Sequence, residues 1–268
     1  MTAVPQPIAG RGVQLRAFRA MCERDAWVTV RYEFLAFLAQ ALLQPIFFLF
    51  VFGRVLPEIG SASVSYGNRL MPGVMALTLM LTALQNTALP LVIEFSFSRE
   101  IEDRLLAPLP TWALAWQKCM VAALRGIIAA VVILPLAAII LPGGIHVVGA
   151  NWAAWALVLI FGSLVAGVMG LVLGTAVPPN RISVAFAITL TPLIFTGAAF
   201  DPWRALSHLP WFQVITLFNP MTYVSEGMRA TLTHQPHMAT GFIVLGIGLS
   251  LIVFGTLGTV GFVRRAVE

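Results

Sequence analysis

Charged side chains are scarce in this sequence. Asp, Glu, Lys and Arg make up 10% of the 268 residues, and 59% of the residues are apolar, whereas soluble domains carry about a quarter charged residues. The apolar residues stand in long uncharged runs, which excludes an ordinary soluble domain and predicts an all-α integral membrane protein. The net charge of +5 does not indicate nucleic-acid binding. The basic residues are scattered at the ends of apolar runs, as expected near a membrane surface.

Lysine and cysteine are also rare, and this limits the chemistry. Lys118 is the only lysine and follows Gln117, so the sequence lacks the Gly-Lys-Ser/Thr element of a phosphate-binding loop. Neither an HExxH pattern nor a Gly-x-Ser-x-Gly elbow is present. We therefore expect that this chain has no catalytic residue and binds no metal or cofactor. Cys22 and Cys119 both fall in segments that we place on the cytoplasmic side, so no structural disulfide is expected.

Six uncharged runs are long enough to cross a membrane, because about 20 helical residues span the hydrocarbon core. Within one domain of residues 1–268, transmembrane helices are predicted near 34–54, 70–93, 119–141, 152–177, 182–200 and 240–263. Residues 205–225 are also uncharged, but Pro210, Asn219 and Pro220 interrupt them. A spanning helix needs continuous backbone hydrogen bonds, so 201–239 is predicted to be a re-entrant loop on the outer side, with a segment that lies on the surface as the alternative.

The distribution of basic residues predicts the orientation. Six crossings place both termini on one side, and Lys and Arg concentrate on the cytoplasmic side of membrane proteins. On the terminal side fall Arg11, Arg16, Arg19, Arg24, Arg31, Arg99, Arg104, Lys118, Arg125, Arg181, Arg264 and Arg265; on the other fall Arg54, Arg69, Arg204 and Arg229. Both termini are therefore predicted to be cytoplasmic. Arg125 is expected in the first turns of the third span, where its side chain can extend to the inner surface.

Two further segments have clear patterns. Residues 13–33 combine apolar and basic residues and predict an amphipathic helix on the inner leaflet, with a solvated basic tail as the alternative. In the fourth span Gly162, Ala166, Gly170 and Gly174 are spaced by four. Such ladders of small residues allow two helices to approach closely in lipid.

A charged block separates the second and third spans. In residues 94–110, Arg99 pairs with Asp103 and Glu100 with Arg104 at a spacing of four, which supports a solvent-facing helix. The alternative is a charged connector that only keeps the loop soluble, but the apolar residues of the block exceed what solubility needs. None of the six predicted spans carries an ionisable group near its centre, so energy for uphill transport would enter from outside the membrane.

A short helix over 220–233 is predicted at the outer surface. Asn219 suits the N-cap position and Pro220 the first helical position. Glu226 and Arg229, three residues apart, are expected to pair. Whether this element gates a path or only caps its outer end is left open.

With these segments placed, the chain resembles the membrane subunit of ATP-binding-cassette (ABC) exporters of the type-2 permease family. The resemblance covers nearly the whole chain. Its motifs are Arg99-Glu100 with Arg104-Leu105-Leu106-Ala107-Pro108, Phe195-Thr196-Gly197-Ala198-Ala199-Phe200, and Asn219-Pro220-Met221-Thr222-Tyr223 with Arg229.

The resemblance implies roles for three groups of residues. The block at 94–110 would contain a cytoplasmic coupling helix that docks on a separate ATPase subunit, through Arg99, Glu100, Ile101, Glu102, Asp103, Arg104, Leu105 and Leu106. A translocation path would be lined by Phe47, Phe48, Gln85, Asn86, Phe195 and Phe200, for each of which ordinary helix packing is the alternative. The outer helix or gate would contain Asn219, Pro220, Tyr223, Glu226 and Arg229.

The same resemblance implies an assembly of two six-span subunits, identical or different, with two cytoplasmic ATPases that hold ATP and Mg. The chain would export a hydrophobic or amphipathic molecule, such as a drug, an antibiotic or a lipid-linked compound, across the cytoplasmic membrane of a prokaryote. A passive channel or an ion-coupled secondary carrier is the alternative. A membrane-embedded enzyme is the third hypothesis, although we find no cluster of titratable groups for it.

Overall fold

The structure is a computed structural model that describes residues 10–29, 31, 34–61, 63, 66–95, 109–142, 144–145 and 150–267. Within these ranges all regular structure is helical and no strand occurs, in agreement with the predicted all-α class. The helices are α1 (Arg11–Val28), α2 (Phe34–Phe50), α3 (Leu56–Glu58), α4 (Tyr66–Ile93), α6 (Thr111–Ile140), α7 (Trp152–Ala176), α8 (Ile182–Thr196), α9 (Pro210–Thr216), α10 (Pro220–Leu232) and α11 (Thr240–Val267). Two 3-10 turns, Pro179–Arg181 and Trp203–His208, precede α8 and α9.

Five stretches of the described chain are long and apolar enough to cross a membrane. They are Phe34–Glu58, which joins α2 and α3 through a π-helical turn at Val51–Val55, and the helices Tyr66–Ile93, Thr111–Ile140, Trp152–Ala176 and Thr240–Ala266. The predicted count of six is not confirmed. The stretch expected at 182–200 holds α8, which ends at Thr196 after 15 residues and is only about 22 Å long.

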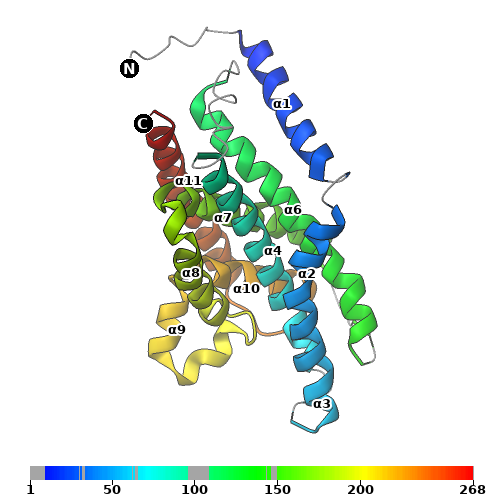
Figure 1. The fold of residues 1–268 in the computed structure, drawn as a ribbon. Helices are drawn as coiled ribbons and strands as arrows, with labels where there is room; N and C mark the ends of the chain where they lie inside the picture. Colours follow the sequence, from blue (N-terminus) through cyan, green and yellow to red (C-terminus); the bar gives the residue numbers. More distant parts are fainter. Residues whose placement is uncertain are drawn as a thin grey trace.

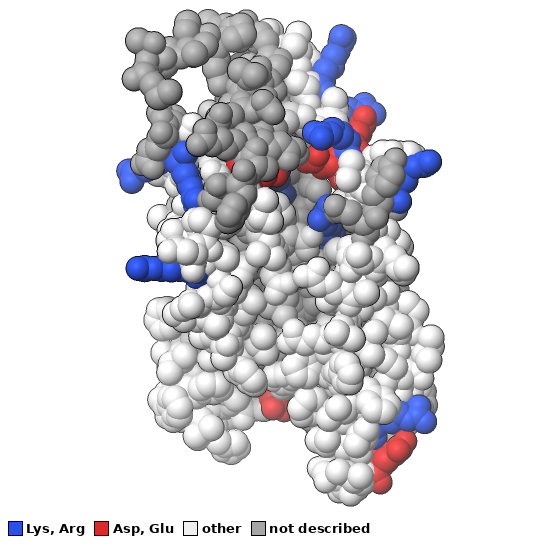
Figure 2. All heavy atoms as spheres, viewed as in Figure 1, with Lys and Arg blue, Asp and Glu red and all other residues white. Residues whose placement is uncertain are grey.

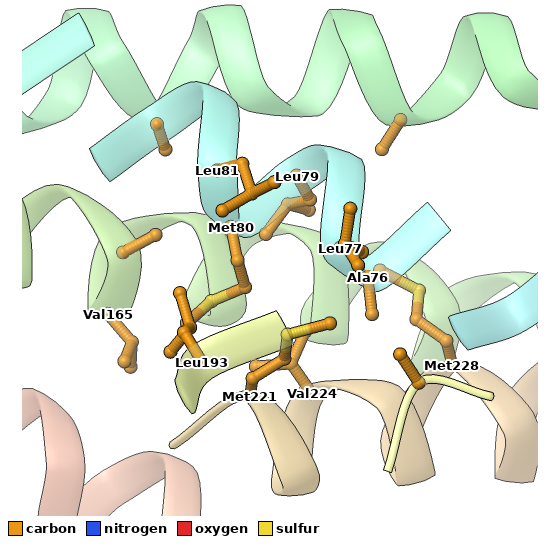
Figure 3. Close-up of a cluster of buried hydrophobic side chains, with 14 of the residues drawn as sticks. Ala76, Leu77, Leu79, Met80, Leu81, Val165, Leu193, Met221, Val224 and Met228 are labelled. Atoms are coloured by element: carbon orange, nitrogen blue, oxygen red, sulfur yellow. The ribbon is translucent and has the colours of Figure 1, made fainter. Parts of the chain in front are cut away.

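Helix α4 forms the centre of the bundle (Figure 1), and most of its residues are buried between α6, α7 and α10. In Figure 3, Leu77 and Met80 of α4 lie with Met221 and Val224 of α10 and Leu193 of α8 in one hydrophobic cluster. Helix α4 is apolar on all sides, and such a helix is expected to be buried on all sides. Helix α10 packs against α4 and therefore also lies inside the bundle.

The ladder of small residues brings α7 against α4, as its spacing predicts. A Cβ atom on Gly170 would lie 2.4 Å from the carbonyl oxygen of Leu84, and one on Gly174 would lie 3.0 Å from Cβ of Leu91. On Gly162 it would meet Val224 of α10 at 2.8 Å. Only glycine permits these approaches, so the ladder sets how closely α4, α7 and α10 pack.

Helix α1 begins and α11 ends at the same end of the bundle (Figure 1). Figure 2 shows that most of the visible Lys and Arg side chains gather at this end. Helix α1 packs along α6, and its Phe18 and Met21 contact a hydrophobic cluster that contains Leu114 and Phe262. The eight residues predicted to couple to an ATPase, 99–106, lie outside the described residues.

Candidate functional site

The chain leaves the helix after α8 in a sharp turn at residues 197–200. Ala198 has a φ of 50°, a left-handed conformation that is uncommon for residues other than glycine. The turn ends the intrahelical hydrogen bonds of α8 and frees carbonyl oxygens inside the bundle. These carbonyls need donors, because a buried polar group without a partner destabilises the fold.

Asn219 supplies donors to α8 and an acceptor to α10. Its side-chain oxygen accepts a hydrogen bond from the backbone N–H of Met221 at 2.9 Å, which is the predicted N-cap. Its amide nitrogen donates to the carbonyl of Leu193 at 3.0 Å and to Oγ1 of Thr196 at 2.9 Å. One side chain thus starts α10 and holds the end of α8.

Helix α10 makes further hydrogen bonds of this kind. The Ser225 hydroxyl donates to the carbonyl of Gly197 at 2.8 Å. The Tyr223 hydroxyl donates to the carbonyl of Leu217 at 2.7 Å, while its ring covers Gly246 of α11. The signature residues therefore join α8, α10 and α11 by direct contacts.

Glu226 and Arg229 form an ion pair at the centre of this network, and both side chains are fully buried. Oε1 of Glu226 also accepts from the backbone N–H of Trp203 at 2.9 Å, and Oε2 accepts from that of Met238 at 2.6 Å. Arg229 donates to the carbonyl of Ala198 at 3.2 Å. The pair thus joins the segments before and after α10, and buried charges need partners of this kind.

One prediction about this helix is wrong: it was expected to lie at a surface, but 11 of its 13 residues are buried inside the bundle. The physical reason is the turn at residues 197–200. Its free carbonyls provide polar partners inside the bundle, so a helix with many polar side chains is stable there.

The turn also presses against the central helix. A Cβ atom on Gly73 of α4 would lie 1.7 Å from the carbonyl oxygen of Ala199. Gly73 lies seven residues after Tyr66, and therefore about 10 Å along α4 from that end. The network of residues 197–200, Asn219, Glu226 and Arg229 is therefore built on α4 at this depth, and we call it the outer hub after the side on which the sequence predicts it.

Three of the predicted path residues meet beside the outer hub. Phe48 lies edge to face with Phe200 at a ring distance of 5.4 Å, and Phe195 lies 6.5 Å from Phe200. Phe52 joins them, 5.8 Å from Phe200, and was missed by the sequence analysis although it lies one helical turn after Phe48. Phe47 is 60% exposed and does not belong to this aromatic group.

Gln85 and Asn86 lie further along α4 and do not reach the aromatic group. Asn86 accepts a hydrogen bond at 2.7 Å from Arg125 of α6, whose Nε also donates to Oγ1 of Thr29 at 3.0 Å. Arg125 was expected in the first turns of its span. This is wrong, because α6 begins at Thr111 and Arg125 lies near its middle.

A cavity of about 760 Å³ opens next to the outer hub. Tyr66 and Arg69 at the start of α4 line it together with Asp201, Arg204 and His234. Trp203, adjacent to these residues, is the residue whose N–H binds Glu226. The aromatic group, the outer hub and this cavity therefore follow one another along the start of α4.

A bundle of long apolar helices, with a short buried helix folded back into it, defines a multi-pass helical membrane protein. The chain belongs to the ABC-2 type transporter family, whose pattern matches residues 16–233. It is 25% identical over 213 residues to the inner membrane transport permease YadH of Escherichia coli (strain K12), covering 77% of this chain and 80% of YadH. It is 26% identical over 243 residues to the putative transport permease ycf38 of Cyanophora paradoxa, covering 84% and 80% of the two chains.

Membership in this family has three direct consequences. The chain is a permease subunit for transport and a multi-pass membrane protein. It works in a membrane complex with an ATPase subunit, and ATP hydrolysis belongs to that partner. The resemblance found from the sequence motifs is therefore confirmed at the level of the family.

Proposed function

We propose that this chain forms the membrane half of an ATP-driven exporter that moves a hydrophobic or amphipathic molecule out across the cytoplasmic membrane. The single observation that supports this most is the aromatic group of Phe48, Phe52, Phe195 and Phe200 beside the outer hub. Aromatic side chains offer apolar contact area without fixed charge. A drug, an antibiotic or a lipid-linked molecule is a suitable cargo for such a lining.

In this proposal the outer hub stays fixed during transport, and the ring contacts of the aromatic group separate. Each oxygen of Glu226 is bonded to a different segment, and Gly73 leaves no space between α4 and the turn at 197–200. The aromatic contacts between α2 and Phe200 depend only on ring packing. They are the contacts that a movement of α2 breaks without leaving a buried polar group unsatisfied.

The proposed orientation places both termini in the cytoplasm. It rests on the excess of Lys and Arg at the end of the bundle where α1 begins and α11 ends (Figure 2). The cavity lined by Tyr66 and Asp201 then opens outward. In the complete complex, two permease subunits, identical or different, would face each other with two ATPases below them, which hold ATP and Mg.

Residues 99–106 are proposed as the coupling helix, and a charge-reversal experiment tests this. Glu100→Arg with Arg104→Glu reverses the charges that would meet the ATPase, so co-purification of the ATPase subunit should fall by at least about tenfold. Arg54→Glu with Glu58→Arg swaps the charges of an exposed pair between the π-helical turn Val51–Val55 and α3, and serves as the control. Equal recovery of the ATPase with both double variants would contradict the coupling role.

An ion-coupled carrier is the second candidate, because Glu226 is an ionisable group inside the bundle. Both of its oxygens accept backbone hydrogen bonds in addition to Arg229, so proton exchange would break the outer hub. Transport that follows an imposed proton or sodium gradient without ATP, and that Glu226→Gln abolishes, would favour this candidate.

A further inference from the structure

Two cavities meet beneath α1, at the end of the bundle opposite the outer hub. The first, which we call the polar cavity, has a volume of about 340 Å³ and is lined by Arg24, Asn86, Glu94, Lys118 and Arg125 among others. The second, which we call the apolar groove, has a volume of about 630 Å³ between α1, α6 and α7. Val121 of α6 lines both, so the two spaces are adjacent.

Glu94 brings to the polar cavity a carboxylate oxygen that accepts no hydrogen bond from the described residues. Its side chain is 9% exposed, and Oε1 accepts from Lys118, while Oε2 is buried and has no hydrogen-bond partner among the residues that the structure describes. An unsatisfied carboxylate oxygen is unfavourable unless a ligand or water donates to it. Pro90, which also lines this cavity, has no N–H, so the carbonyl of Asn86 lacks its usual helical donor as well.

Basic side chains line the same cavity from two helices. Arg24 of α1 and Arg125 of α6 both face it, and Arg125 is held in place by hydrogen bonds to Asn86 and Thr29. Guanidinium groups bind phosphate oxygens well. The cavity therefore combines acceptors suited to an ammonium group with donors suited to a phosphate.

The apolar groove supplies the other half of an amphipathic site. Met120, Leu124 and Ile127 of α6 line it, with Cys22 and Ala26 of α1 at its edge. A hydrocarbon chain packs there against apolar side chains through van der Waals contacts, and the groove starts where the polar cavity ends. A ligand with a charged head and an apolar tail fits both.

We propose that this site binds one phospholipid whose headgroup carries both a phosphate and a primary ammonium group. The ammonium donates to Glu94, the phosphate accepts from Arg24 and Arg125, and an acyl chain lies in the apolar groove. The lipid joins α1 to α4 and α6 and acts as part of the fold. This site is distinct from the aromatic group proposed to contact the cargo, and its occupancy requires neither ATP nor a partner subunit.

Native mass spectrometry of the full chain in detergent, mixed with lipids of identical acyl chains, tests the proposal. Phosphatidylethanolamine should be retained about tenfold better than phosphatidylcholine, the usual effect of one charge-assisted hydrogen bond. The N-methyl and N,N-dimethyl lipids keep an N–H, so the main loss should come with the third methyl group. Phosphatidylglycerol, which has the phosphate but no cation, should bind as weakly as phosphatidylcholine.

A pair of variants assigns the effect to Glu94. Glu94→Gln should remove the preference for phosphatidylethanolamine, whereas Glu58→Gln, an exposed acidic residue paired with Arg54, should keep it. If Glu94→Gln does not fold, retention of the N-methylated lipids by the wild-type chain still tests whether an N–H of the headgroup is required. Equal retention of phosphatidylethanolamine and phosphatidylcholine, or an unchanged preference in a folded Glu94→Gln protein, would overturn the proposal. Because the assay involves no transport, its failure leaves the exporter proposal untouched.

Discussion

Glu226 and Arg229 face each other on one turn of α10, and neither side chain reaches the surface of the bundle. Their partners come from three separate segments, at Ala198, Trp203 and Met238. An exposed pair at the same spacing would matter little, because water screens it. Here the pair organises the segments on both sides of α10, and its position sets the first prediction.

Removing one member of this pair should strongly destabilise the protein. Glu226→Gln leaves Arg229 charged and buried, which costs about 3 to 5 kcal/mol. The thermal midpoint of the purified protein, followed by size-exclusion chromatography after heating, measures the loss. Glu58→Gln breaks the exposed pair with Arg54 and should cost at most about 1 kcal/mol. Similar midpoints for the two variants would show that the pair does not hold the hub.

Gly73 should tolerate no side chain. Gly73→Ala places a methyl group against the backbone of Ala199, which cannot rotate away, and a cost of about 3 kcal/mol is expected from overpacking. Gly248→Ala is the matched control, because no atom lies within 4 Å of a Cβ at that position in α11. The same heating assay should separate the two variants clearly, and an unaffected Gly73→Ala protein would contradict the close packing of α4 on the turn.

Asn219 should contribute more than a helix cap. Asn219→Ala removes the cap and also two hydrogen bonds to α8, so about 2 to 3 kcal/mol should be lost. Asn151→Ala removes only the cap of α7, where the side chain accepts from Ala154, and should cost about 1 kcal/mol. Equal losses in urea or heat unfolding would show that the bonds to α8 add nothing.

The native cysteines report the orientation without engineering. Cys22 of α1 is partly exposed and Cys119 is buried, so a membrane-impermeant maleimide should label only Cys22. In inside-out vesicles Cys22 should be labelled, and in intact cells it should not be. Cys22→Ala provides the background. Labelling of Cys22 in intact cells would place α1 outside and contradict the proposed orientation.

The reaction of Cys22 with maleimide should depend on pH over a higher range than that of a free thiol. Burial raises the pKa of the Cys22 thiol above its ordinary value, and the nearby Asp25 and Glu23 raise it further. Because the thiolate is the reactive form, alkylation at neutral pH should be slower than that of a free thiol. The rate should still rise with pH above the ordinary thiol pKa, where a free thiol has levelled off. A rate profile that matches free cysteine would contradict the described surroundings of Cys22.

The sequence was sufficient for those features that depend on neighbouring residues. The cap at Asn219, the start of α10 at Pro220, the pairing of Glu226 with Arg229 and the close approach at Gly170 all follow from local spacing. Membrane embedding follows from the uncharged runs in the same way. The family resemblance rested on these local motifs and is confirmed.

The burial of α10 was not predictable from local spacing. Its many polar residues indicate a surface helix, and only the carbonyls freed after Thr196 make the interior favourable for Ser225 and Arg229, which donate to them. Phe47 and Phe48 illustrate a second limit. Adjacent helical residues point about 100° apart, so only one of them contacts Phe200, and the composition does not tell which one. Whether the aromatic group lines a path remains a prediction.

Transport into inside-out proteoliposomes tests whether this chain is an export permease driven by a partner ATPase. Vesicles should contain the permease chain, the ATPase subunit that co-purifies with it, or both, with a fluorescent amphipathic dye outside. Dye should accumulate only when both proteins and ATP are present, and Phe200→Ala should change the rate while ATPase recovery stays constant. Accumulation against a gradient by the permease chain alone, without ATP, would contradict ATP-driven export.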